Sequence, residues 1–87
     1  MLVMLFFYYA EGCGACHAAQ APLAEFHRKH PRLFVVKRNV TRKDWQQKGV
    51  EIKATPTYTL TVNGRLLRQH VGSMTEQELE AFTAVES

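Results

Sequence analysis

The chain has 87 residues, of which 46% are hydrophobic and 22% are charged, and its net charge is +3. These values are ordinary for a soluble globular protein, and the length fits a single domain over residues 1–87. The two cysteines can form at most one bridge, which excludes a secreted scaffold held together by several disulfides.

The first predicted element is a strand over residues 2–9. No basic residue precedes this apolar run, and it leads directly into the cysteine pair, so we interpret it as a buried central strand and not as a signal peptide. It is also much shorter than the roughly 20 apolar residues that a membrane-spanning helix needs. We therefore expect a cytoplasmic protein that does not associate with a membrane.

A pair of cysteines, Cys13-Gly-Ala-Cys16, follows this strand and begins a helix predicted from residue 13 to about residue 30. The first N–H groups of a helix have no intrahelical partner, and with the helix dipole they favour negative charge. We therefore expect Cys13 to ionise more readily than a free cysteine. Cys16 lies one turn deeper on the same side, close enough to form a small disulfide ring. This spacing predicts thiol–disulfide exchange.

The remaining elements complete a mixed α/β pattern. A run of β-branched residues predicts a second strand at residues 33–40, which would form a parallel βαβ unit with the first strand and helix. The other expected elements are a short helix at residues 41–49, strands at 57–62 and 65–71 joined by an Asn63-Gly64 turn, and a last helix that begins at the capping box of Thr75 and Glu78. The fold class is α/β, in the order β-α-β-α-β-β-α, with a four-stranded mixed sheet and helices on both faces.

Basic side chains are concentrated in the middle of the chain. Residues 28–48 contain eight lysines and arginines and a single acid, Asp44. A solvated face is the ordinary interpretation of such a run, and a docking surface for an acidic partner is the alternative. No nucleic-acid partner is expected, because no stacking aromatics are interleaved with the basic residues.

Three other uses of the cysteine pair are alternatives to redox chemistry. A purely structural disulfide is the simplest of them. Zinc could bind Cys13, Cys16 and His17, but a closed zinc site needs a fourth ligand. The same three residues match the attachment pattern of c-type haem, with Met74 as a distal ligand, but the predicted strands do not fit a helical cytochrome. We expect no metal and no cofactor.

Five short motifs, in this order, identify a resemblance to the thioredoxin family. They are Tyr9-Ala-Glu-Gly-Cys-Gly-Ala-Cys16, Val36-Lys-Arg-Asn-Val40, Ile52-Lys-Ala-Thr-Pro-Thr57, Asn63-Gly64 and Val71-Gly72. The resemblance covers nearly the whole chain but lacks the strand and helix that precede the dithiol in a full-length thioredoxin. It implies a monomeric thiol–disulfide oxidoreductase that acts on protein disulfides through a mixed disulfide. A reductase or glutathione would then restore the dithiol.

The resemblance also implies roles for individual residues. Cys13 would be the nucleophile and Cys16 the resolving cysteine, while Pro56 would be cis and the backbone of Thr55 would pair with an extended substrate. The implied substrate groove comprises Gly12, Val40, Ala54, Thr55, Pro56, Val71, Gly72 and Ser73. Glu11, His17 and Lys37 are the auxiliary candidates.

The sequence departs from the family pattern around the dithiol. Phe7 stands where thioredoxins have a buried acid that helps to move the proton of the second cysteine, and Lys37 is left without that acid as its partner. Glu11 is the candidate to replace this acid. Gly12 replaces the usual tryptophan, and Ala15 replaces a proline.

Two other functions remain open from the sequence. The first is a glutaredoxin-like enzyme that works with glutathione, which the chain length favours. The second is a non-enzymatic interaction domain that binds a partner through its basic face, in which case the dithiol would be incidental.

Overall fold

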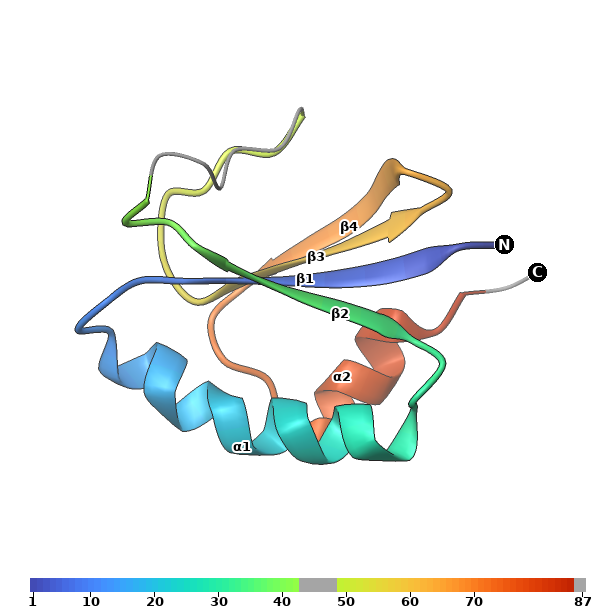
Figure 1. Ribbon diagram of the computed structural model, residues 1–87, viewed down its shortest axis with the longest axis horizontal. Helices are drawn as coiled ribbons and strands as arrows, with labels where there is room; N and C mark the ends of the chain where they lie inside the picture. Colours follow the sequence, from blue (N-terminus) through green and yellow to red (C-terminus); the bar gives the residue numbers. More distant parts are fainter. Residues whose placement is uncertain (43–48, 86–87) are drawn as a thin grey trace.

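The computed structural model describes residues 1–42 and 49–85, which form four strands and two helices (Figure 1). In chain order these are β1 (Val3–Tyr9), α1 (Gly14–Lys29), β2 (Phe34–Asn39), β3 (Thr57–Val62), β4 (Arg65–Val71) and α2 (Glu76–Thr83). The predicted order of these six elements is confirmed. The short helix expected at residues 41–49 falls largely on residues 43–48, outside the described part of the chain.

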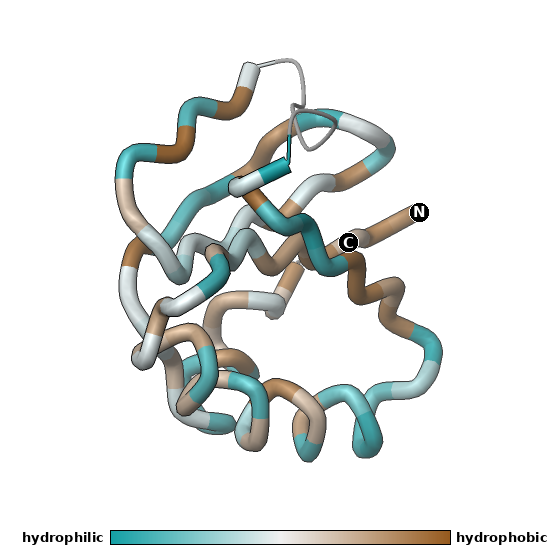
Figure 2. The backbone as a smooth tube through the Cα atoms, turned by 60° about the vertical axis from the view of Figure 1, so that its left-hand side comes forward, coloured by the Kyte–Doolittle hydropathy of each residue, from teal (hydrophilic) through white to brown (hydrophobic). Residues whose placement is uncertain are grey.

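The strands form one mixed sheet in the order β2-β1-β3-β4. β1 pairs in parallel with β2 and antiparallel with β3, and β3 pairs antiparallel with β4. β1 is an inner strand of the sheet, which explains why the chain is hydrophobic near its N-terminus, where the tube in Figure 2 is brown. Asn63 and Gly64 have φ angles of 52° and 82°, as the predicted two-residue turn requires.

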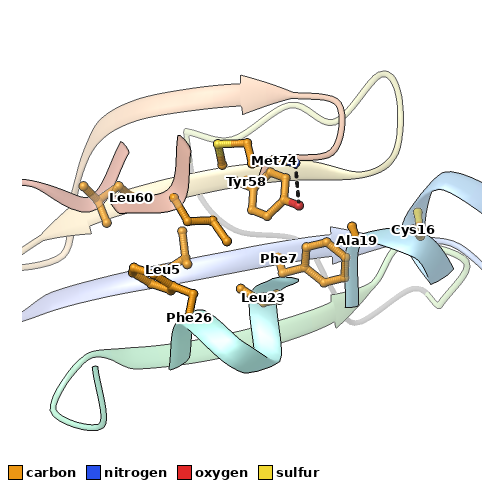
Figure 3. Packing of buried hydrophobic residues seen from close by; sticks show 10 residues of the cluster. Leu5, Phe7, Cys16, Ala19, Leu23, Phe26, Tyr58, Leu60 and Met74 are labelled. Atoms are coloured by element: carbon orange, nitrogen blue, oxygen red, sulfur yellow. Dashed lines mark hydrogen bonds between the residues drawn. The ribbon is translucent and has the colours of Figure 1, made fainter. Parts of the chain in front are cut away.

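The main core lies between one face of the sheet and the two helices (Figure 3). Side chains alternate along a strand, so every second residue of β1 and β3 points toward the helices. The buried cluster comprises Leu5, Phe7, Cys16, Ala19, Leu23, Phe26, Tyr58, Leu60, Met74 and Leu79. Within the described ranges both helices cover this same face. The expectation of helices on both faces depends on residues 41–49, most of which are not described.

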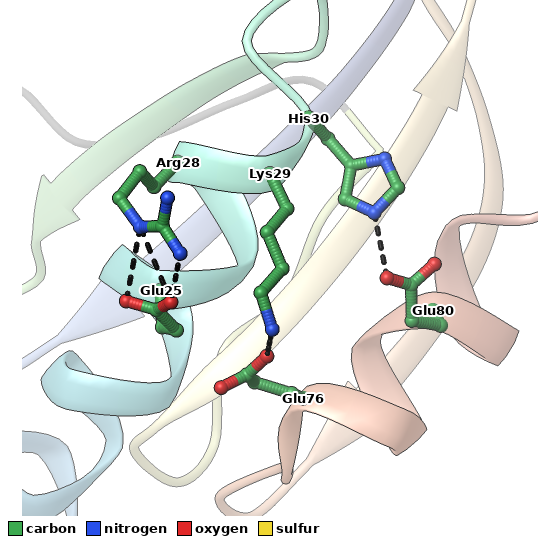
Figure 4. A network of polar contacts seen from close by, with 6 residues as sticks. All are labelled: Glu25, Arg28, Lys29, His30, Glu76 and Glu80. Atoms are coloured by element: carbon green, nitrogen blue, oxygen red, sulfur yellow. Dashed lines mark hydrogen bonds and ion pairs between the residues drawn. The ribbon is translucent and has the colours of Figure 1, made fainter.

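Ion pairs join the C-terminal end of α1 to α2 (Figure 4). Lys29 Nζ lies 2.9 Å from Glu76 Oε2, and His30 Nε2 lies 2.6 Å from Glu80 Oε1. At the start of α2, the Thr75 hydroxyl accepts the Glu78 N–H and the Glu78 carboxylate accepts the Thr75 N–H, both at 3.1 Å, which confirms the predicted capping box. The capping box therefore defines the start of α2, and the two pairs link its exposed side to α1.

Of the two described helices, neither is long and apolar enough to cross a membrane.

Candidate active site

The sulfur of Cys13 caps the helix that Cys13 precedes. Cys13 is the N-cap of α1, with an extended backbone (φ −86°, ψ 106°), and its Sγ accepts the amide N–H of Cys16 at 3.1 Å. Gly12, with φ of +76°, allows the chain to turn from β1 into this helix. The cap places the sulfur against helix N–H groups that favour negative charge.

The two cysteines form a disulfide with a Cα–Cα distance of 5.2 Å, which confirms that this spacing lets them bond to each other. Their surroundings differ. Cys16 is only 2% exposed and packs in the core with Phe7, whereas Cys13 is partly exposed. Cys13 is therefore the sulfur that a partner molecule can reach.

A cis proline loop lies against the dithiol. The peptide bond between Thr55 and Pro56 is cis, as the resemblance implied, and Cys13 Sγ lies 3.7 Å from the Thr55 carbonyl oxygen. The Pro56 carbonyl accepts the N–H of Gly72 at 2.9 Å. Segments that precede β3 and follow β4 are thus brought to the N-terminus of α1.

The other residues expected in the substrate groove are spread around this centre. Val71 is 58% exposed and pairs with Thr57 across the β3–β4 ladder. Ala54 accepts the Thr57 hydroxyl at 2.6 Å through its carbonyl oxygen. Ser73 lines a separate groove between α1 and the start of α2. Val40 is half-buried, and its N–H donates to the Tyr9 carbonyl at 2.8 Å, beside the end of β1.

Of the auxiliary candidates, His17 lines a hollow with Cys13, whereas Lys37 and Glu11 have separate contacts. His17 is exposed and lines a hollow of about 390 Å³ together with Ala10, Gly12, Cys13, Gly14 and Gln20. Lys37 Nζ donates to Gln20 Oε1 at 2.8 Å, and Asn39 Nδ2 donates to Glu11 Oε1 at 3.3 Å. The sequence analysis missed Gln20, although its position two helical turns after Cys13 predicts that both lie on the same face of α1.

No group of three or more histidine, cysteine, aspartate or glutamate side chains is placed to bind a metal ion within residues 1–42 and 49–85. The reactive feature of this region is the disulfide itself.

Comparison with known proteins agrees with the fold and the dithiol. A family model described as thioredoxin matches residues 2–85, and the chain belongs to the thioredoxin family. Its Cys13–Cys16 pair places it among the thiol–disulfide oxidoreductases of that family. No curated protein matches the sequence.

Solved thioredoxin structures superpose on most of the chain. Oxidised mitochondrial thioredoxin 3 from Saccharomyces cerevisiae is 27% identical, with a TM-score of 0.81 over 93% of this chain and 76% of that one. A structure from work on the thiol-resolving mechanism of a yeast mitochondrial 1-Cys peroxiredoxin is 26% identical, with a TM-score of 0.83 over 94% of this chain and 76% of that one. Oxidised thioredoxin from Plasmodium falciparum, at 20% identity and a TM-score of 0.79, covers 94% of this chain and 82% of its own, and shares the fold.

Proposed function

We propose that this protein reduces disulfides in protein substrates through a mixed disulfide with Cys13. The observation that carries the proposal is the position of the Cys13 sulfur. It caps α1, it is partly exposed, and it lies 3.7 Å from the Thr55 carbonyl beside Pro56. A thiolate at a helix N-terminus is stabilised, and the thiolate is the form that attacks disulfides.

In the proposed reaction, the Cys13 thiolate attacks one sulfur of the substrate disulfide. That S–S bond breaks, a Cys13–substrate disulfide forms, and the other substrate sulfur leaves as a thiolate that takes a proton from water. Cys16 then gives its proton to water and attacks Cys13 Sγ, which breaks the Cys13–substrate bond, and the second substrate sulfur leaves as a thiolate that is protonated by water. The substrate gains two electrons, and Cys13 and Cys16 are left as the disulfide observed in the structure.

The substrate backbone is proposed to lie along Thr55 and Pro56. Gly72 supports this assignment, since it has no side chain to keep a second backbone away and its N–H already donates to Pro56. A reductase or glutathione in a reducing compartment such as the cytoplasm would return the disulfide to the dithiol. The related yeast structure comes from work on glutathione and thioredoxin systems, so both electron sources deserve a direct assay.

The test is a covalent trap. Cys16→Ser should accumulate mixed disulfides through Cys13, since the second displacement can no longer occur. Incubation with a model disulfide protein followed by non-reducing electrophoresis and mass spectrometry measures the adduct. Cys13→Ser is the matched control and should trap nothing. A folded Cys16→Ser variant that forms no adduct would rule out the mechanism. Partner binding that Cys13→Ser leaves intact, together with the absence of any adduct, would favour the interaction-domain alternative.

A further inference from the structure

We propose that three exposed basic residues beside the dithiol dock substrate proteins whose disulfide is flanked by acidic side chains. These residues, here called the basic flank, are Lys37, Arg42 and Lys53. The inference rests on the proposed function, because it names the class of substrate that the dithiol would reduce.

The basic flank lies at the end of the sheet where the dithiol is. Lys37 contacts Gln20, which lines the hollow beside Cys13. The Arg42 N–H donates to the Asn39 carbonyl at 3.2 Å, and the Asn39 side chain donates to Glu11, two residues before Cys13. Lys53 is two residues before Thr55, so their Cα atoms are at most about 7.6 Å apart, and the Thr55 carbonyl is 3.7 Å from Cys13 Sγ. Figure 1 shows the segments that leave β2 and enter β3 at the same end of the molecule as the start of α1.

The contacts of the flank residues leave most of their positive charge without a paired carboxylate. Lys37 donates to the neutral Gln20 at 2.8 Å. The acids at this end of the described chain are Glu11 and Glu51, and Glu51 lies 4.0 Å from Lys53. The three basic side chains of the flank therefore outnumber the two acids in this described part of the chain.

The carboxylates of α2 do not pair with the basic flank. Glu76 and Glu80 pair with Lys29 and His30 at the C-terminal end of α1 (Figure 4). Glu78 accepts the Thr75 N–H in the capping box. These contacts within the described chain leave the positive charge of the basic flank in place.

The opposite side of the dithiol has the reverse charge. The groove that contains Ser73 runs between Ala18 on α1 and the first turn of α2, where Glu76 and Glu78 line it. Acidic residues of a substrate would be repelled on this side and attracted on the side of the basic flank. The charge pattern thus fixes the orientation of an acidic substrate as well as its class.

Charges at the edge of a contact surface act mainly on the rate of association, and salt weakens their effect. The test therefore measures the rate constant for reduction of three cyclic disulfide peptides of equal length, with aspartate, serine or lysine on both sides of the cysteines. The reduced protein should reduce the aspartate peptide about tenfold faster than the lysine peptide at low salt, and this preference should largely disappear in about 1 M NaCl.

Charge reversal assigns the preference to the basic flank. The double variant Arg42→Glu/Lys53→Glu should lower the ratio of the aspartate-peptide rate constant to the lysine-peptide rate constant at least about threefold. It should leave the rate constant for the serine peptide unchanged. Arg65→Glu is the matched control, because Arg65 is also exposed but lies at the start of β4, beside the distant Asn63-Gly64 turn. Comparing each variant with the wild type removes differences in the intrinsic reactivity of the peptides.

The possible failures are distinguishable. If the double variant and Arg65→Glu keep the same rate ratio as the wild type, the docking inference is overturned and the proposed function stands. If the wild type reduces none of the three peptides, the proposed function is overturned and the inference with it.

Discussion

The rings of Phe7 and Tyr58 lie 5.2 Å apart, opposite each other on the neighbouring strands β1 and β3. Both side chains are fully buried, and burial raises the pKa of the Tyr58 hydroxyl while the hydrogen bond from the Met74 amide lowers it. Phe7 occupies the position where the resemblance to thioredoxins implies a buried acid. In this chain that position is part of the apolar core beneath Cys16, so the resolving cysteine has no carboxylate from β1 beside it.

Phe7→Asp tests whether this position can still accept an acid. A carboxylate there would lose its hydration among apolar side chains, so the free energy of unfolding should fall by about 3–5 kcal/mol. Phe7→Leu keeps the site apolar and should cost about 1 kcal/mol. Urea denaturation at neutral pH measures both changes, and equal losses for the two variants would contradict the assignment.

Gly72→Ala tests the backbone beside Pro56. Gly72 has φ of +101°, and a Cβ there would have nothing within 4 Å, so the expected loss of about 1–2 kcal/mol comes from backbone strain and not from a clash. Gly14→Ala is the matched control, because that glycine is helical and has equally open space. Thermal or urea denaturation should find only Gly72→Ala destabilised. An equally stable Gly72→Ala protein would argue against this backbone conformation.

The capping box of α2 predicts that the stability of the fold depends on pH in acidic solution. Hydrogen bonds from Thr75, chiefly that of its backbone N–H, hold the pKa of Glu78 below its usual value. A carboxyl group with a lowered pKa in the folded state stabilises the fold above its unfolded pKa of about 4.3, and this contribution is lost as the pH falls through the lower folded value.

Glu78→Gln should therefore make the free energy of unfolding depend less steeply on pH in acidic solution. Glutamine can still accept the Thr75 N–H but does not titrate, so between about pH 5 and pH 3 the variant should lose less stability than the wild type. Unfolding free energies across this range provide the measurement. Parallel profiles for the two proteins would show that Glu78 makes no pH-dependent contribution.

Much of the fold could be predicted because its signals are local. The Thr75-to-Glu78 spacing predicted the cap of α2, and Asn63-Gly64 predicted the turn between β3 and β4. The two-residue spacing of the cysteines at the end of a strand predicted the helix start and the disulfide. The cis bond before Pro56 came only from the family resemblance, since most such bonds are trans.

Contacts between distant parts of the chain could not be predicted in this way. The hydrogen bond between Lys37 and Gln20 depends on how β2 packs beside α1. The Arg68 side chain on β4 donates to the carbonyls of Phe82 and Ala84 near the end of α2, a contact between separate elements that no local pattern encodes. The proximity of Cys13 to Thr55 likewise joins residues 42 positions apart.

The most direct test of the account is the pKa of the Cys13 thiol in the reduced protein. The rate of alkylation by iodoacetamide as a function of pH measures it, and the Cys16→Ser variant gives the same reading without a second thiol while keeping the backbone N–H that caps Cys13. The account predicts half-ionisation clearly below the value of about 8.5 for an unstructured cysteine. A value at or above about 8.5 would contradict it.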